Sequence, residues 1–131
     1  MDFQLIINNF LVILQGLDET LVLIFLSLII GFFISIPFAL ARVSSIKILS
    51  QSVYYYIFVI RGTPLLVQIY LIYFGLGSIK AVRESFLWIL LKEPFWCGVI
   101  ALVINTVAYT TEIFRGGIQS VTKGQIESCK S

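Results

Sequence analysis

The sequence predicts an all-α membrane protein, a polytopic helical bundle. Three observations predict it: 59% of the 131 residues are hydrophobic, only 12% are charged, and the apolar runs are long enough to cross a bilayer. The segment 20–41 holds no charged residue, and as an α-helix it would be about 33 Å long, enough to span about 30 Å of hydrocarbon. We expect one domain over 1–131 with three transmembrane helices, near 17–41, 53–79 and 94–115.

The first expected helix opens with Asp18 and Glu19, because acidic side chains suit the positive end of the helix dipole. It ends at Arg42. Gly31 and Pro37 lie inside it, and membrane helices tolerate such residues when neighbouring helices satisfy the loosened backbone. This favours a bundle over a single anchor. A short polar connector, 43–52, is expected to follow.

The second apolar run, 53–79, is interrupted by Arg61, Gly62, Thr63 and Pro64. Thr63 can cap the free amides of a helix that starts here, and Pro64 suits its first position, where a missing N–H costs nothing. We therefore expect these residues to begin or re-aim the helix. A charge is costly at the middle of a bilayer, so we expect Arg61 near the cytoplasmic boundary.

After a second connector at 79–93, Pro94 opens the third helix, which carries small and polar residues on one face. They are Gly98, Ala101, Asn105, Tyr109, Glu112 and Gly116. The opposite face, expected to meet lipid, carries Val99, Val103, Val107 and Phe114. Asn105, Tyr109 and Glu112 are thus candidates for a translocation path, and hydrogen bonding between helices is an equally open alternative. For Glu112, a pair with Arg115 is favoured over a solute contact.

The segment after the third helix predicts one more short helix. Thr122 and Gln125 have the spacing of a capping box, so we expect a helix over 122–129. Basic residues near short loops favour the cytoplasmic side. With the N-terminus outside, Arg42, Lys47, Arg115, Lys123 and Lys130 fall inside, and Lys80, Arg83 and Lys92 fall outside. The segment 122–129 would then be cytoplasmic.

Several functional classes are excluded by composition. The net charge of +2 is scattered, which leaves no basic stripe for nucleic acid. There is no histidine, and Cys97 and Cys129 lack metal-ligand spacing, so we expect no metal site and no cofactor. No nucleophile is paired with a histidine and no glycine loop could cradle phosphate, so an enzyme is not expected. The N-terminus lacks the basic region of a cleaved signal peptide.

Three motifs occur in order along the chain: 61–68 (RGTPLLVQ), 105–118 (NTVAYTTEIFRGGI) and 124–127 (GQIE). Together they resemble the permeases of polar-amino-acid ABC importers, above all the branch that moves histidine, arginine, lysine and ornithine. The resemblance covers about 15–131. It implies a bacterial inner-membrane permease with five spans per subunit. It also implies a second permease subunit, itself or a sister, two separate ATPase subunits that hydrolyse ATP, and an extracytoplasmic amino-acid-binding protein.

The resemblance also assigns a role to the segment 118–131, the start of a cytoplasmic coupling loop. In this family a Glu-Ala-Ala signature docks into the ATPase. Gly124 and Glu127 match it, Ser128 and Cys129 replace the two alanines, and Thr122 stands where proline is usual.

The later glycine of the signature and the last two spans are absent from the sequence, so we expect a truncated permease. It could be a decayed gene product, a split permease or a piece of a longer sequence. The alternative function is a non-transporting remnant, a membrane interaction protein that binds permease or ATPase partners.

Overall fold

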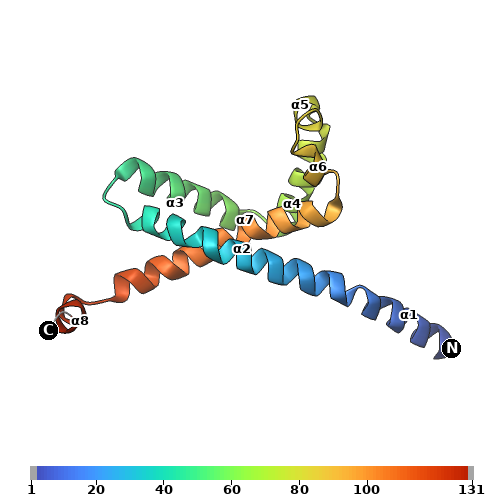
Figure 1. Ribbon diagram of the computed structural model, residues 1–131, viewed down its shortest axis with the longest axis horizontal. Helices are drawn as coiled ribbons and strands as arrows, with labels where there is room; N and C mark the ends of the chain where they lie inside the picture. Colours follow the sequence, from blue (N-terminus) through green and yellow to red (C-terminus); the bar gives the residue numbers. More distant parts are fainter. Residues whose placement is uncertain (1–2, 130–131) are drawn as a thin grey trace.

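The computed structural model describes residues 3–129, and every regular element in that part of the chain is helical, which confirms the all-α prediction. In chain order the elements are α1 (Phe3–Gln15), α2 (Leu17–Val43), α3 (Lys47–Gly62), α4 (Leu65–Tyr70), the π-helical turn η1 (Leu71–Leu76), α5 (Lys80–Arg83), α6 (Trp88–Leu91), α7 (Pro94–Ser120) and α8 (Lys123–Ser128). The helices α2, α3 and α7 form a bundle, from which α4, α5 and α6 project to one side (Figure 1).

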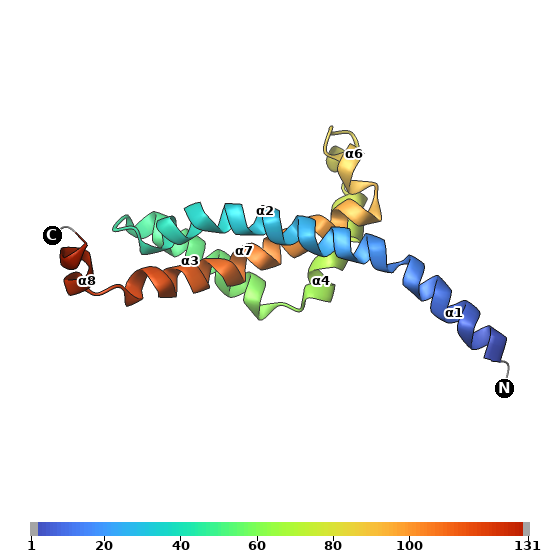
Figure 2. The same cartoon turned by 60° about the horizontal axis from the view of Figure 1, so that its bottom comes forward.

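Two helices of 27 residues each, α2 and α7, lie side by side and run in the same direction (Figure 2). The face of α2 that meets α7 is built from small residues four positions apart. They are Ser27, Gly31, Ser35 and Ala39, all buried. A Cβ at Gly31 would lie 2.6 Å from Thr106 Cγ2, so only glycine allows this approach. We call these four residues the small-residue stripe.

The branched residues of α7 do not all face outward. Val99 and Val107 are 3% and 2% exposed, so the expectation that they meet lipid is wrong. The reason is that α7 is the central helix and packs against both α2 and α3, which buries more than one stripe of its surface. The apolar surface of α7 left open instead includes Ile113, which is 70% exposed.

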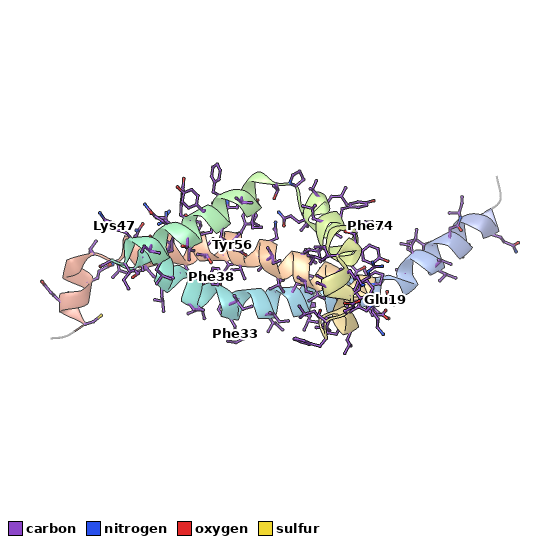
Figure 3. All side chains as sticks on the ribbon, turned by 90° about the horizontal axis from the view of Figure 1, so that it is seen from above. Glu19, Phe33, Phe38, Lys47, Tyr56 and Phe74 are labelled. Atoms are coloured by element: carbon purple, nitrogen blue, oxygen red, sulfur yellow. The ribbon has the colours of Figure 1, made fainter. Side chains whose placement is uncertain are left out.

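The helix α3 packs against α7 through a small apolar cluster. It consists of Val53, Ile57 and Ala108. The Phe38 and Tyr56 rings meet beside it at 5.4 Å between centroids, one from α2 and the other from α3 (Figure 3). The Tyr56 hydroxyl donates a 2.6 Å hydrogen bond to the Ile104 carbonyl, which joins α3 to α7. This satisfies the polar end of a half-buried tyrosine.

The second apolar run is a broken helix. Its first part, α3, begins at Lys47, six residues before the expected start. Only residues 44–46 therefore separate α3 from α2. It ends at Gly62, and the pair formed by α3 and the α4–η1 segment is bent by 104° at the break.

Thr63 does not cap α4 as expected. Its hydroxyl donates backward, to the Val59 carbonyl at 3.0 Å and the Ile60 carbonyl at 3.3 Å, and so serves the last turn of α3. Pro64 lies just before the first residue of α4, with extended backbone. No side chain therefore caps the first turn of α4, and contacts other than a cap stabilise the bend.

Length and composition suit a membrane. The segment 9–43 and α7 are each long and apolar enough to cross a bilayer, and the bent pair would be a third span. Many large apolar side chains point outward, among them Phe33 at 65% exposed (Figure 3).

The short helix α1 was not expected, and the connector 79–93 holds two one-turn helices. The limits of the three spans in a bilayer stay a prediction.

Candidate functional site

Asn105 lies in an uncharged hydrogen-bonded cluster. Its Nδ2 donates to Gln68 Oε1 at 3.4 Å, across from α7 to α4. Gln68 is only 6% exposed, and its Nε2 lies within bonding distance of the Ile60 carbonyl (2.8 Å), the Thr63 carbonyl (3.1 Å) and the Thr63 hydroxyl (2.9 Å). We call these four residues the Gln68 clasp. Asn105 therefore makes a contact between helices, the alternative that its sequence position left open.

Glu112 lies in a charged cluster farther along α7. Its Oε2 accepts hydrogen bonds from Arg115 Nη2 at 2.7 Å and Arg115 Nε at 2.9 Å, so the expected pair one turn apart is present. Its Oε1 is buried, accepts no hydrogen bond, and lies 3.6 Å from Arg42 Nε of α2. One carboxylate thus holds two guanidinium groups from different helices.

Arg42 also ties the end of α2 to the start of α3. Its Nη1 donates to Ser50 Oγ at 3.1 Å, and that hydroxyl donates to the Arg42 carbonyl at 2.8 Å. The guanidinium lies 5.1 Å from the centre of the Tyr54 ring. Cation–π contacts of this kind contribute about 0.5–1 kcal/mol at exposed sites. Arg42 is thereby fixed beside Glu112 by groups from α3.

Arg61 has a different environment. Its guanidinium lies 5.0 Å from the centre of the Tyr109 ring, and within the described residues no carboxylate lies at ion-pair distance from it. Tyr109 is fifteen residues after the start of α7 and eleven before its end. The charge is therefore beside the middle of α7. A position of Arg61 at the membrane boundary stays a prediction.

A cleft of about 390 Å³ collects these charged and aromatic groups. It is lined by Tyr54, Ile57, Phe58, Arg61, Gly62, Tyr109 and Glu112. We call it the arginine cleft. Two of the three candidate path residues, Tyr109 and Glu112, line it together with Arg61 and Gly62. The lining does not include Asn105, Thr63 or Pro64. Asn105 and Thr63 belong to the Gln68 clasp instead.

The charges at the arginine cleft do not balance. Arg61 and Glu112 are the charged residues of its lining, and Arg42 and Arg115, which lie next to the lining, both engage Glu112, so three positive charges stand against one negative charge in and around the cleft. Charged groups within membrane segments are costly unless they pair or line a hydrated cavity. The surplus of positive charge makes the cleft suited to a ligand that carries a negative group.

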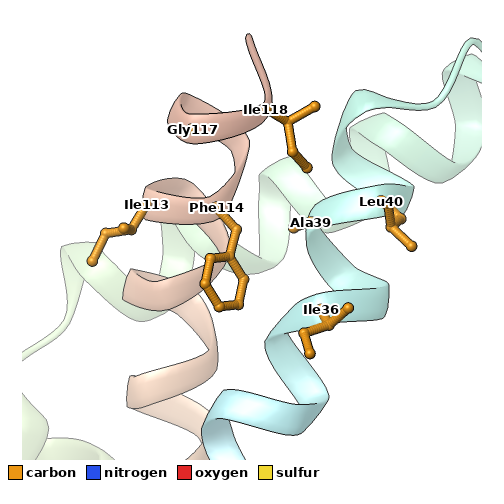
Figure 4. Close-up of a pocket in the computed structure, with 7 residues that line it drawn as sticks. All are labelled: Ile36, Ala39, Leu40, Ile113, Phe114, Gly117 and Ile118. Carbon is orange, nitrogen blue, oxygen red and sulfur yellow. The ribbon is translucent and has the colours of Figure 1, made fainter. Parts of the chain in front are cut away.

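A second hollow beside α7, on the side of α2, has a different chemistry. It measures about 500 Å³ and lies between α2 and α7 (Figure 4). Its lining is apolar: Ile36, Ala39, Leu40, Ile113, Phe114, Gly117 and Ile118. Such a surface suits hydrocarbon or an apolar helix and offers no side-chain partner to a polar solute. The arginine cleft is the better candidate for a solute site.

The proposed coupling residues gather elsewhere, on α8. Gly124, Glu127, Ser128 and Cys129 are all exposed, and α8 lies beyond the end of α7 (Figure 1). The backbone N–H of Thr122 donates to Gln125 Oε1 at 3.1 Å, so the expected reciprocal cap forms here. The structure thus places Gly124, Glu127 and Ser128 on one short helix and Cys129 directly after its last residue.

Sequence reasoning missed three parts of this arrangement. The small-residue stripe is visible as a four-residue spacing of Ser, Gly, Ser and Ala, the pattern that lets membrane helices approach closely. Gln68 is a polar residue inside an apolar run, which is itself a signal of burial against a partner. The approach of Arg42 to Glu112 has no local signal, because the two residues are 70 positions apart.

Comparison with known proteins is consistent with this geometry. Residues 27–131 match the family described as binding-protein-dependent transport system inner membrane component. The chain belongs to this family. The resemblance seen in the three sequence motifs is thereby confirmed.

Two curated relatives illustrate the match. The nopaline transport system permease protein of Agrobacterium fabrum is 50% identical over 132 residues, which cover 100% of this chain and 55% of the relative. The histidine/lysine/arginine/ornithine transport system permease protein of Escherichia coli K12 is 39% identical over 117 residues, which cover 88% of this chain and 49% of the relative. The chain spans about half the length of the curated relatives it matches.

A solved structure supports the same fold. It is described as an amino acid ABC transporter with histidines, and it superimposes with a TM-score of 0.79 at 41% sequence identity. The match covers 99% of this chain and 56% of the other. The helical arrangement of this family member therefore corresponds to part of a permease of known structure.

Proposed function

We propose that this family member is the transmembrane permease subunit of an ATP-driven importer for polar amino acids, basic ones above all. ATP hydrolysis belongs to separate ATPase subunits. The observation that carries the proposal is the arginine cleft, a charged and open site between α3 and α7 of an otherwise apolar helical bundle. The printed names of the relatives, which include nopaline, arginine and histidine/lysine/arginine/ornithine transport permeases, support it.

In this proposal the solute passes Tyr109 and Glu112 along α7. Both line the arginine cleft, and Asn105 lies about one turn nearer the start of the helix. Partners are a second permease subunit, the ATPase subunits, an extracytoplasmic amino-acid-binding protein and the surrounding lipid.

The docking of the ATPase is assigned to α8. Its exposed face includes Glu127, and its position beyond the end of α7 leaves it accessible. The test is a chimera in which residues 1–131 continue into the second half of the nopaline relative, expressed with the partner subunits of that relative. We expect uptake of labelled L-arginine or nopaline, and we expect Glu127→Arg to abolish both ATPase association and uptake.

The control for this test is Gln4→Arg in α1, an exposed residue at the other end of the chain. It should leave uptake intact. A chimera that assembles but moves no solute would contradict the transport function and favour a non-transporting interaction protein. Full uptake after Glu127→Arg would contradict the coupling role of this residue.

The N-terminus is proposed to lie outside. Single cysteines at Gln4, Ser45 and Ser128, in a background with Cys97→Ala and Cys129→Ser, test this with a membrane-impermeant thiol reagent on intact cells. We expect the cysteine at position 4 to react, because the basic residues favour a cytoplasmic location for the other two. Reaction at 45 and 128, with none at 4, would reverse the orientation.

A further inference from the structure

Resting on the permease function proposed above, we propose that Arg61 binds the carboxylate of the transported amino acid in the arginine cleft. The starting observation is the unbalanced charge. Glu112 is engaged by Arg115 and lies against Arg42, whereas Arg61 has no acidic partner in the part of the chain that the structure describes. Arg61 is exposed and lies against the Tyr109 ring, so its guanidinium is accessible to an anionic group that enters the cleft.

The geometry of Arg61 leaves it free to receive one. Its contact with Tyr109 is through the face of that ring, at 5.0 Å from the ring centre. A guanidinium carries five N–H donors in its own plane, and a planar fork of this kind binds a carboxylate through two parallel hydrogen bonds. The ring contact therefore orients the side chain without consuming its donors.

The volume and neighbours of the cleft fit a free amino acid. About 390 Å³ is available, and small-molecule sites begin at about 300 Å³. Tyr54 and Tyr109 supply aromatic walls, and Phe58 adds an apolar one. The one carboxylate in the lining, Glu112, is already held by Arg115 and forms no ion pair with Arg61.

An oxyanion at Arg61 could come from the solute or from the phosphate of an anionic lipid, and one experiment separates them. The full chain is placed in nanodiscs of phosphatidylcholine, and the binding of L-arginine is compared with that of agmatine, which differs only in lacking the carboxylate. We expect wild-type protein to bind L-arginine about 10- to 100-fold more tightly, the range for a charge-assisted pair. Arg61→Gln should reduce this preference to within about threefold.

Arg83→Gln is the matched control, because Arg83 is an exposed arginine in the connector outside the cleft. It should keep the full preference for L-arginine. Arg61→Lys should keep part of it, since it restores the charge but not the planar fork. The proposal is overturned if wild-type protein fails to bind L-arginine, if it binds both compounds equally, or if the preference survives Arg61→Gln.

A second set of nanodiscs containing phosphatidylglycerol tests the lipid. We expect the affinity for L-arginine to be unchanged, and a loss greater than about tenfold would assign Arg61 to lipid phosphate and overturn its assignment to the solute. Uptake by the chimera separates this inference from the function on which it rests. An active chimera whose L-arginine preference persists after Arg61→Gln refutes the role of Arg61 alone. An inactive chimera, with the preference intact in the nanodiscs, refutes the transport function alone.

Discussion

The two halves of α7 meet the rest of the protein through different forces. Residues 94–107 pack by shape: Thr106 fits against Gly31, and a Cβ at Gly98 would lie 3.3 Å from Leu23. Residues 108–120 add charged contacts to apolar ones, with Ala108 in the cluster against α3 and with Glu112 and Arg115 beside a cleft. Residues 94–107 hold no charged residue, whereas Arg61, beside the second half, has no ion pair among the described residues. One helix thus combines a closely packed half with a half that lines an open cleft.

The largest expected effect tests the charged half. Glu112→Ala should lower the free energy of unfolding by about 2–3 kcal/mol, because two arginines that are less than a third exposed lose their shared carboxylate. Detergent-induced unfolding followed by circular dichroism measures this. Glu84→Ala is the control, since the Lys80–Glu84 pair is 83% and 67% exposed, and it should change stability by less than about 0.5 kcal/mol. Equal effects of the two substitutions would remove the contrast between the halves of α7.

A smaller effect tests the half that packs by shape. Gly31→Ala should cost about 1–2 kcal/mol, because the new Cβ would lie 2.6 Å from the methyl group of Thr106. Gly116→Ala is the control in the charged half, where a Cβ would meet no other part of the protein within 4 Å. It should be neutral or stabilising, since alanine favours a helix. The pair Gly31→Ala with Thr106→Ser should recover part of the loss, and an absence of recovery would show that this contact does not set the spacing.

The smallest effect concerns the Gln68 clasp, which belongs to the first half by position and uses neutral hydrogen bonds. Gln68→Leu removes the donor that serves Ile60 and Thr63, and we expect a loss of about 1 kcal/mol in the same unfolding assay. Gln51→Leu is the control on the exposed surface of α3 and should have little effect. A loss for Gln68→Leu as large as that for Glu112→Ala would mean that neutral and charged contacts along α7 matter equally.

Local signals predicted the parts of the fold that local physics determines. Asp18 and Arg42 mark the two ends of α2 within a residue, and Pro94 is the first residue of α7. The pair of Glu112 and Arg115 follows from its spacing alone. Each of these depends on residues within one or two turns.

The remainder depends on which helices become neighbours. A helical wheel assumes one buried face, so it predicted that Val107 faces lipid. Val107 is in fact buried, because α7 is covered by both α2 and α3. Thr63 was expected to cap the start of α4, but its hydroxyl donates to the carbonyls at the end of α3. The arginine cleft joins α3 to α7 across almost 50 positions of sequence, and no local pattern specifies that meeting.

The break between α3 and α4 has a mechanical consequence. The α4–η1 segment contains twelve residues after the 104° bend. It therefore forms an arm about 17 Å long that projects from the bend at Thr63 and Pro64. A rotation of about 10° there would displace the far end of the arm by about 3 Å. Gln68 lies close to this bend, where a contact has a short lever arm and the displacement by such a rotation would be smallest. The bonds of the Gln68 clasp therefore resist such a rotation only through a short arm, and the contacts of η1 with α7 and α6, farther from the bend, would resist it more strongly.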